Sequence, residues 1–63
     1  MKKYFVSYNV NHQKEFTNAK RVVKFLRSLA DLAGVKVEIG ALANDEWTSD
    51  KFVGGREFLA GGR

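Results

Sequence analysis

The sequence contains no cysteine and no proline. The lack of cysteine excludes disulfides and thiolate metal sites, which stabilise many chains of this size. A chain of 63 residues buries only about 60% of the surface that its unfolded form exposes, so its stability is marginal. A well-packed core or a partner chain must supply the rest. We expect one small domain over residues 1–63, with residues 60–63 as a flexible tail.

Long apolar runs are also missing. No segment approaches the roughly 20 apolar residues that a membrane-spanning helix needs. The apolar run near the N-terminus is short and is interrupted by Ser7 and Asn9, unlike that of a signal peptide. We therefore expect a cytoplasmic protein without a membrane partner. Apolar residues make up 44% of the chain, which predicts a globular core rather than disorder.

Charge is present in excess, and it is unevenly distributed. The formal net charge is +4. Residues 1–33 hold seven Lys and Arg against Glu15 and Asp31, whereas residues 34–63 hold four basic and five acidic residues. An asymmetry of this kind predicts one positive face, and such faces attract nucleic acid, anionic membranes or acidic proteins.

Two segments have the composition of strands. Residues 3–10 are rich in aromatic and β-branched residues, and alternation predicts that one face of this strand points to the core. That face holds Tyr4, Val6, Tyr8 and Val10, which leaves Phe5 on the other side. Residues 35–42 alternate in the same way and predict a second, half-buried strand.

An amphipathic helix is predicted over residues 19–33, followed by Gly34 as a left-handed terminator. Asn11, Thr17 and Asn18 are candidate N-caps, and the apolar Phe16 favours a start before it. The apolar face recurs at spacings of three and four. It consists of Ala19, Val22, Val23, Leu26, Leu29, Ala30 and Ala33, widened by Phe25 and Leu32.

These elements predict an α+β fold of β-α-β(-β) order, with one helix on a two- or three-stranded sheet. The two strands joined by the helix would be parallel, through a right-handed crossover. Residues 43–50 are expected to form a turn or loop. Residues 51–59 are either a third strand bent at Gly54–Gly55 or a loosely packed tail. Exposed strand edges make a homo-oligomer plausible.

The first candidate site is the polar side of the helix, formed by Lys20, Arg21, Lys24 and Arg27. Four cations on one helix side suit phosphate oxygens, with counterion release driving binding. The alternative is a solvated helix face on which Arg27 pairs with Asp31.

Aromatic and Gly/Arg residues give further candidates. Phe5 is a candidate for stacking on an unpaired base or for a protein interface. Trp47, among acidic residues, either covers one end of the core or anchors an interface. The triplet Gly-Gly-Arg occurs at 54–56 and at 61–63, and Gly/Arg tracts bind RNA, so Arg56 is a third candidate.

Enzyme activity is not expected. The single histidine, His12, lacks a recognisable nucleophile turn around Ser7, Ser28 or Ser49. The acidic residues Asp45, Glu46 and Asp50 are interpreted as a solvated turn rather than a metal site. No phosphate loop or dinucleotide fingerprint is present. We expect no catalytic residues, no metal and no cofactor.

Two short stretches resemble known families. YFVSYN is similar to the opening strand of TIR domains, and VSYNV resembles the first strand of small ferredoxin-like nucleases linked to CRISPR adaptation. Those nucleases carry a metal-binding aspartate after the tyrosine, where this chain has Asn9. Each match covers fewer than ten residues, and we assign the chain to neither family.

The leading hypothesis is a small basic, non-enzymatic protein that binds nucleic acid through the cationic helix side, with RNA favoured over duplex DNA. RNA is favoured because no helix-turn-helix or zinc-finger pattern is present. The alternative is an inhibitor or accessory factor of the phage or mobile-element type. It would dock on an acidic or RNA-binding surface of a host enzyme or toxin, with Phe5 and Trp47 as apolar anchors.

Overall fold

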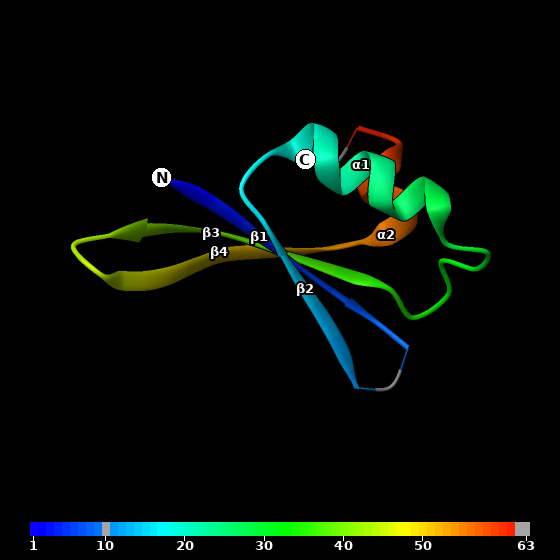
Figure 1. Cartoon of the computed structure of the whole chain (residues 1–63), viewed down its shortest axis with the longest axis horizontal. Helices are drawn as coiled ribbons and strands as arrows, with labels where there is room; N and C mark the ends of the chain where they lie inside the picture. Colours follow the sequence, from blue (N-terminus) through cyan, green and yellow to red (C-terminus); the bar gives the residue numbers. More distant parts are fainter. Residues whose placement is uncertain (10, 62–63) are drawn as a thin grey trace.

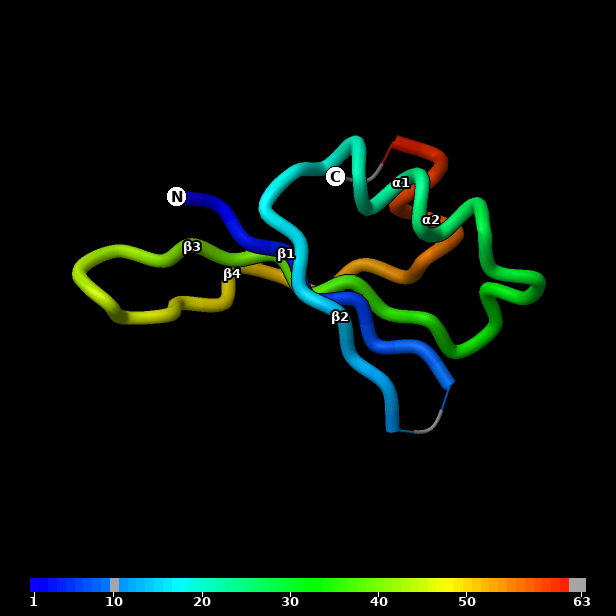
Figure 2. The backbone as a smooth tube through the Cα atoms, in the orientation of Figure 1, coloured from blue at the N-terminus to red at the C-terminus, as the bar shows by residue number. Residues whose placement is uncertain are grey.

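The computed structural model describes residues 1–9 and 11–61. Four strands form one antiparallel sheet in the order β2-β1-β3-β4. Strand β1 spans Lys2–Tyr8, β2 His12–Phe16, β3 Lys36–Ala43 and β4 Glu46–Gly54. Helix α1 spans Ala19–Ser28 and the short helix α2 spans Gly55–Leu59. Both helices lie on one side of the sheet (Figure 1). Figure 2 shows that the β3–β4 hairpin extends beyond them.

The α+β class is confirmed, as is the amphipathic helix packed on a small sheet. The β-α-β order and the parallel pairing are wrong. Residues 11–17 contain β2, which forms an antiparallel hairpin with β1 before the helix begins. Because this hairpin reverses the chain, β3 returns from the helix antiparallel to β1, and the two strands are direct neighbours. The sheet therefore has four strands.

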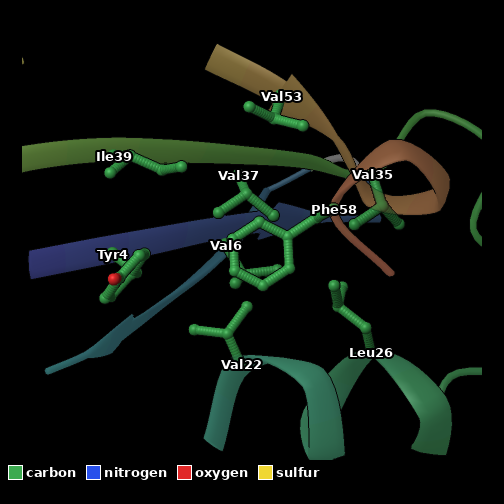
Figure 3. Packing of buried hydrophobic residues seen from close by; sticks show 9 residues of the cluster. All are labelled: Tyr4, Val6, Val22, Leu26, Val35, Val37, Ile39, Val53 and Phe58. Atoms are coloured by element: carbon green, nitrogen blue, oxygen red, sulfur yellow. The ribbon is translucent and has the colours of Figure 1, made fainter. Parts of the chain in front are cut away.

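The core lies between the sheet and the two helices. Strand β1 contributes Tyr4 and Val6, as its alternation predicts, and Tyr8 packs at the margin; Val10 lies outside the described residues. Figure 3 shows Phe58 of α2 between the sheet and the α1 side chains Val22 and Leu26. The nine buried hydrophobic residues of the described part of the chain are Tyr4, Val6, Val22, Leu26, Val35, Val37, Ile39, Val53 and Phe58.

Helix α1 begins where Asn18 caps it. The Asn18 side-chain oxygen accepts a hydrogen bond of 2.7 Å from the Lys20 amide, which satisfies one of the free N–H groups of the first turn. A start before Phe16 is therefore wrong, because Phe16 belongs to β2.

The helix ends at Ser28, five residues before the predicted end. The Ser28 hydroxyl donates to the Phe25 carbonyl at 2.6 Å, and the Asp31 carboxylate accepts from the Ala33 amide at 2.9 Å. Such local bonds compete with helical ones. Leu29 and Leu32 still pack against the core, so the apolar pattern persists through an irregular segment. Gly34, with φ of 77°, turns the chain into β3 instead of ending the helix.

The second half of the chain is more regular than predicted. Strands β3 and β4 meet at Asn44 and Asp45, whose φ angles of 51° and 62° suit a tight two-residue hairpin turn. Residues 43–50 therefore belong mostly to the two strands. The strand predicted within residues 51–59 is present over residues 51–54 as the end of β4, but residues 55–59 form a helix instead of continuing the strand past a bend, and there is no loose tail over 51–59. Strand β4 ends at Gly54, and α2 then places Phe58 in the core.

Candidate nucleic-acid interface

The basic face of α1, which comprises Lys20, Arg21, Lys24 and Arg27, is exposed. A helix turns 100° per residue, so Lys20, Lys24 and Arg27 lie opposite the buried Val22 and Leu26. The first turn of α1 contains no acidic residue. The predicted arrangement of these four cations on one exposed side is therefore present in the structure.

Carboxylates do not neutralise this face. In residues 1–9 and 11–61 the one ion pair is Lys3–Glu15, at 2.6 Å. The pair of Arg27 with Asp31 that belonged to the alternative interpretation is absent from the described ion pairs, because α1 ends before Asp31 and the Asp31 carboxylate accepts a hydrogen bond from the Ala33 amide. The four cations of α1 consequently keep their full charge available to a ligand.

A groove runs between α1 and strand β2, and it brings a fifth cation to this surface. We call it the α1–β2 groove; it is lined by Lys14, Glu15, Phe16, Thr17, Arg21, Lys24, Phe25 and Ser28. Lys14 faces the helix side of the sheet because it is paired with the buried Val6. Its ammonium lies 5.0 Å from the centre of the Phe25 ring and 5.7 Å from that of Phe16. Cation–π attraction thus holds Lys14 over the groove without a carboxylate.

Aromatic side chains pack against one another in and beside the α1–β2 groove. The Phe25 ring contacts Phe16 at 5.4 Å and Tyr8 at 5.0 Å between centroids. Tyr8 in turn stacks on His12 at 5.4 Å. This row of rings joins α1 to the β1–β2 hairpin, so the cations on both sides of the groove are attached to one packed unit.

Glu15 is the one acidic residue of the groove lining. Its carboxylate accepts a 2.6 Å hydrogen bond from the Lys3 ammonium, so its charge is already balanced. On the other side of Lys24 lies a second, shallow depression, lined by Lys20, Val23, Lys24 and Arg27. Lys24 belongs to both depressions and stands between them.

Phe5 and Trp47 come together away from this surface. Phe5 alternates with the buried Tyr4 and Val6, so it lies on the sheet face that carries no helix. The Trp47 ring meets Phe5 edge to face at 4.9 Å. It also covers Gly40, where a Cβ would lie 2.6 Å from the indole. Trp47 therefore does not cover an end of the core; it packs on the opposite face of the sheet.

Carboxylates flank this aromatic pair. Phe5 stands between Glu15 and Glu38 in register, and Phe52 follows Glu38 on β4. Lys3 balances Glu15, whereas Glu38 is in no ion pair of the described residues and would repel a phosphate group. The open sheet face and the basic face of α1 are thus two separate surfaces with different chemistry.

The Gly/Arg segment is structured where it is described. Gly54 and Gly55 join β4 to α2, and a Cβ on Gly55 would lie 3.0 Å from Val35 Cγ1, so packing explains this glycine. Arg56 is exposed on α2 and lines a hollow with Leu32, outside both basic depressions. The second Gly-Gly-Arg copy falls mostly outside the described residues.

Within the described part of the chain, no three His, Asp or Glu side chains lie close enough together to hold a metal ion. His12 packs on Tyr8. No helix within the described residues is long and apolar enough to cross a membrane.

Comparison with protein-family models, with curated proteins and with solved structures found no match to this chain. What the basic surface binds must therefore be inferred from its own side chains.

Proposed function

We propose that this protein binds single-stranded nucleic acid, RNA in particular, through the basic face of α1 and the α1–β2 groove. The observation that carries the proposal is the set of five neighbouring cations that no carboxylate neutralises in the described part of the chain. They are Lys14, Lys20, Arg21, Lys24 and Arg27. Phosphate oxygens are the natural partners of such a set, because binding releases counterions from the nucleic acid.

Repulsion among the cations of α1 lowers the stability of the unbound protein. Lys20 and Lys24 are four residues apart on one helix, and Lys24 and Arg27 are three apart. Like charges at these spacings destabilise a helix by about 0.2–0.5 kcal/mol per pair. No acidic residue within α1 relieves the repulsion. A polyanionic ligand would remove it, so the charge pattern favours binding over a purely solvating role.

The shape of the site favours a single strand. Three of the five cations, Lys14, Arg21 and Lys24, line a groove that also contains Phe16 and Phe25. Basic grooves with aromatic residues are typical of proteins that hold single strands. Reading a DNA major groove by a helix-turn-helix needs a second helix that supports the first across the backbone. Here the other described helix, α2, has five residues and packs its Phe58 into the core.

The direct test is a titration of a fluorescein-labelled 12-nucleotide oligouridine RNA, followed by anisotropy from 20 to 200 mM NaCl. Four or five neutralised phosphates predict a slope of log K against log salt of about −3 to −3.5 for a single strand. A hairpin RNA and a duplex DNA of equal charge serve as comparison ligands and should bind more weakly.

A slope near zero, or no binding at 20 mM NaCl, would contradict the proposal. Polyglutamate is the matched polyanion without bases or phosphates. Binding of polyglutamate equal to that of the RNA would instead point to an acidic protein surface as the partner.

A further inference from the structure

The open face of the sheet carries three features that remain unsatisfied within one chain. Phe52 is 67% exposed, the largest exposure of any Phe, Tyr or Trp side chain in the described residues. Glu38 stands between Phe5 and Phe52 in register, half-buried and without an ion-pair partner in the described part of the chain. Lys36 lies two residues away on the same face of β3, exposed and likewise outside the described ion pairs.

A hollow lies beside the exposed ring. It is lined by Lys36, Phe52, Val53, Gly54 and Glu57. Gly54 pairs with Lys36 across the strands, just as Phe52 pairs with Glu38. The face therefore has one row made of Lys36 and Gly54, and a second row, two residues along, made of Glu38 and Phe52. The row between them, Val37 and Val53, points into the core.

From this arrangement we propose that the open sheet face binds a second copy of this chain, face to face. The two-fold axis lies between the two sheets, over the Val37–Val53 row and parallel to it. Such an axis places the Lys36–Gly54 row of each chain on the Glu38–Phe52 row of the other. Lys36 then faces the partner's Glu38, and Phe52 lies over the partner's Gly54, beside the Glu57 side chain, which lies 3.5 Å from where a Gly54 Cβ would be. The surface is self-complementary in charge.

A second copy fits this face better than nucleic acid does. Glu38, beside Phe5, is in no ion pair of the described residues and disfavours phosphate, whereas Glu15 on the other side of Phe5 is already balanced by Lys3. A carboxylate covered by a partner must be paired to avoid a large desolvation cost. In the two-fold arrangement, Glu38 of each chain pairs with Lys36 of the other. The two α1 helices lie on the outer sides of the pair, so their basic faces stay open.

The dimer is expected to be weak. Strands lie about 4.8 Å apart and rise about 3.3 Å per residue, so a four-stranded face of seven-residue strands covers about 450 Å² in projection. Standard interfaces bury about 800 Å² per partner, and smaller ones are transient. We therefore expect a dissociation constant between about 10 and 500 μM.

Sedimentation equilibrium between 10 μM and 1 mM protein tests the dimer, with reciprocal charge swaps as the decisive variants. Lys36→Glu and Glu38→Lys each place like charges across the two-fold axis, and each should weaken dimerisation more than tenfold. The double variant Lys36→Glu/Glu38→Lys restores both pairs and should recover the wild-type dissociation constant within about threefold. Phe52→Ser, at an exposed position that should tolerate the change, should also weaken dimerisation more than tenfold.

A wild-type chain that stays monomeric at 1 mM would overturn the dimer, as would a double swap no better than the single ones. Circular dichroism of each variant checks that it is folded. Anisotropy with nanomolar protein measures RNA binding by the monomer, so loss of the dimer is distinguishable from loss of the proposed function.

Discussion

Replacing Arg21, Lys24 and Arg27 together by glutamine is expected to weaken binding of oligouridine RNA about a hundredfold at 0.1 M salt. Each phosphate contact contributes a slope of about −0.7, which corresponds to about fivefold in affinity at this salt concentration. The slope itself should fall by about 2. Glutamine is a good helix former, and the change removes like-charge repulsion on α1, so the variant should remain folded.

The matched control removes three charges elsewhere. Lys2, Lys51 and Arg56 are all exposed and lie outside both basic depressions. The triple glutamine variant at these positions has the same net charge as the α1 variant, and its affinity should fall only a few-fold. Equal losses in the two variants would contradict a localised site and would indicate that binding depends on net charge alone.

Phe58→Ala is expected to remove about 3–5 kcal/mol from the free energy of unfolding, a large share of the total. Phe58 is the largest fully buried side chain, and it joins α2 to α1 and to the sheet, with its ring 6.0 Å from that of Tyr4. Truncating a buried phenylalanine costs about 3–5 kcal/mol. A domain of this length has a total free energy of unfolding of roughly 3–9 kcal/mol. Urea unfolding followed by circular dichroism measures the loss.

Phe52→Ala is the control for that experiment, because it removes the same atoms from an exposed site. Measured at 5 μM, where the proposed dimer is largely dissociated, it should change the free energy of unfolding by less than about 0.5 kcal/mol. A Phe58→Ala variant as stable as Phe52→Ala would show that α2 does not belong to the core.

The basic face of α1 was predictable because it depends on one strong local signal. Val22 and Leu26 repeat at the spacing of a helix, and their positions fix where Lys20, Lys24 and Arg27 must point. In the same way, the alternation of Tyr4 and Val6 correctly identified the inner face of β1. Both inferences need only a few neighbouring residues.

Strand β2 was missed because it is an edge strand that is almost wholly exposed. In His12–Phe16 only Phe16 is half-buried, so no alternation marks the strand. Pairing with β1 stabilises it, and that pairing is not visible in the local sequence. Missing β2 also concealed Lys14, whose place beside α1 follows from its register opposite Val6.

Helix α2 was missed for a different reason. It has five residues, its first residue is Gly55, and Gly54 ends β4 directly before it. Glycine weakens any helix pattern. Tertiary packing of Phe58 determines it instead. The largest fully buried side chain therefore comes from a segment whose own sequence preference is weak.

Mapping of amide chemical shifts by NMR, with ¹⁵N-labelled protein and the 12-nucleotide oligouridine RNA, tests the central claim most directly. The account predicts shifts concentrated in Ala19–Ser28 and His12–Phe16, with the indole N–H signal of Trp47 unchanged. Shifts centred on Trp47, Phe5 and Phe52, with α1 unaffected, would contradict it and place the nucleic acid on the open sheet face.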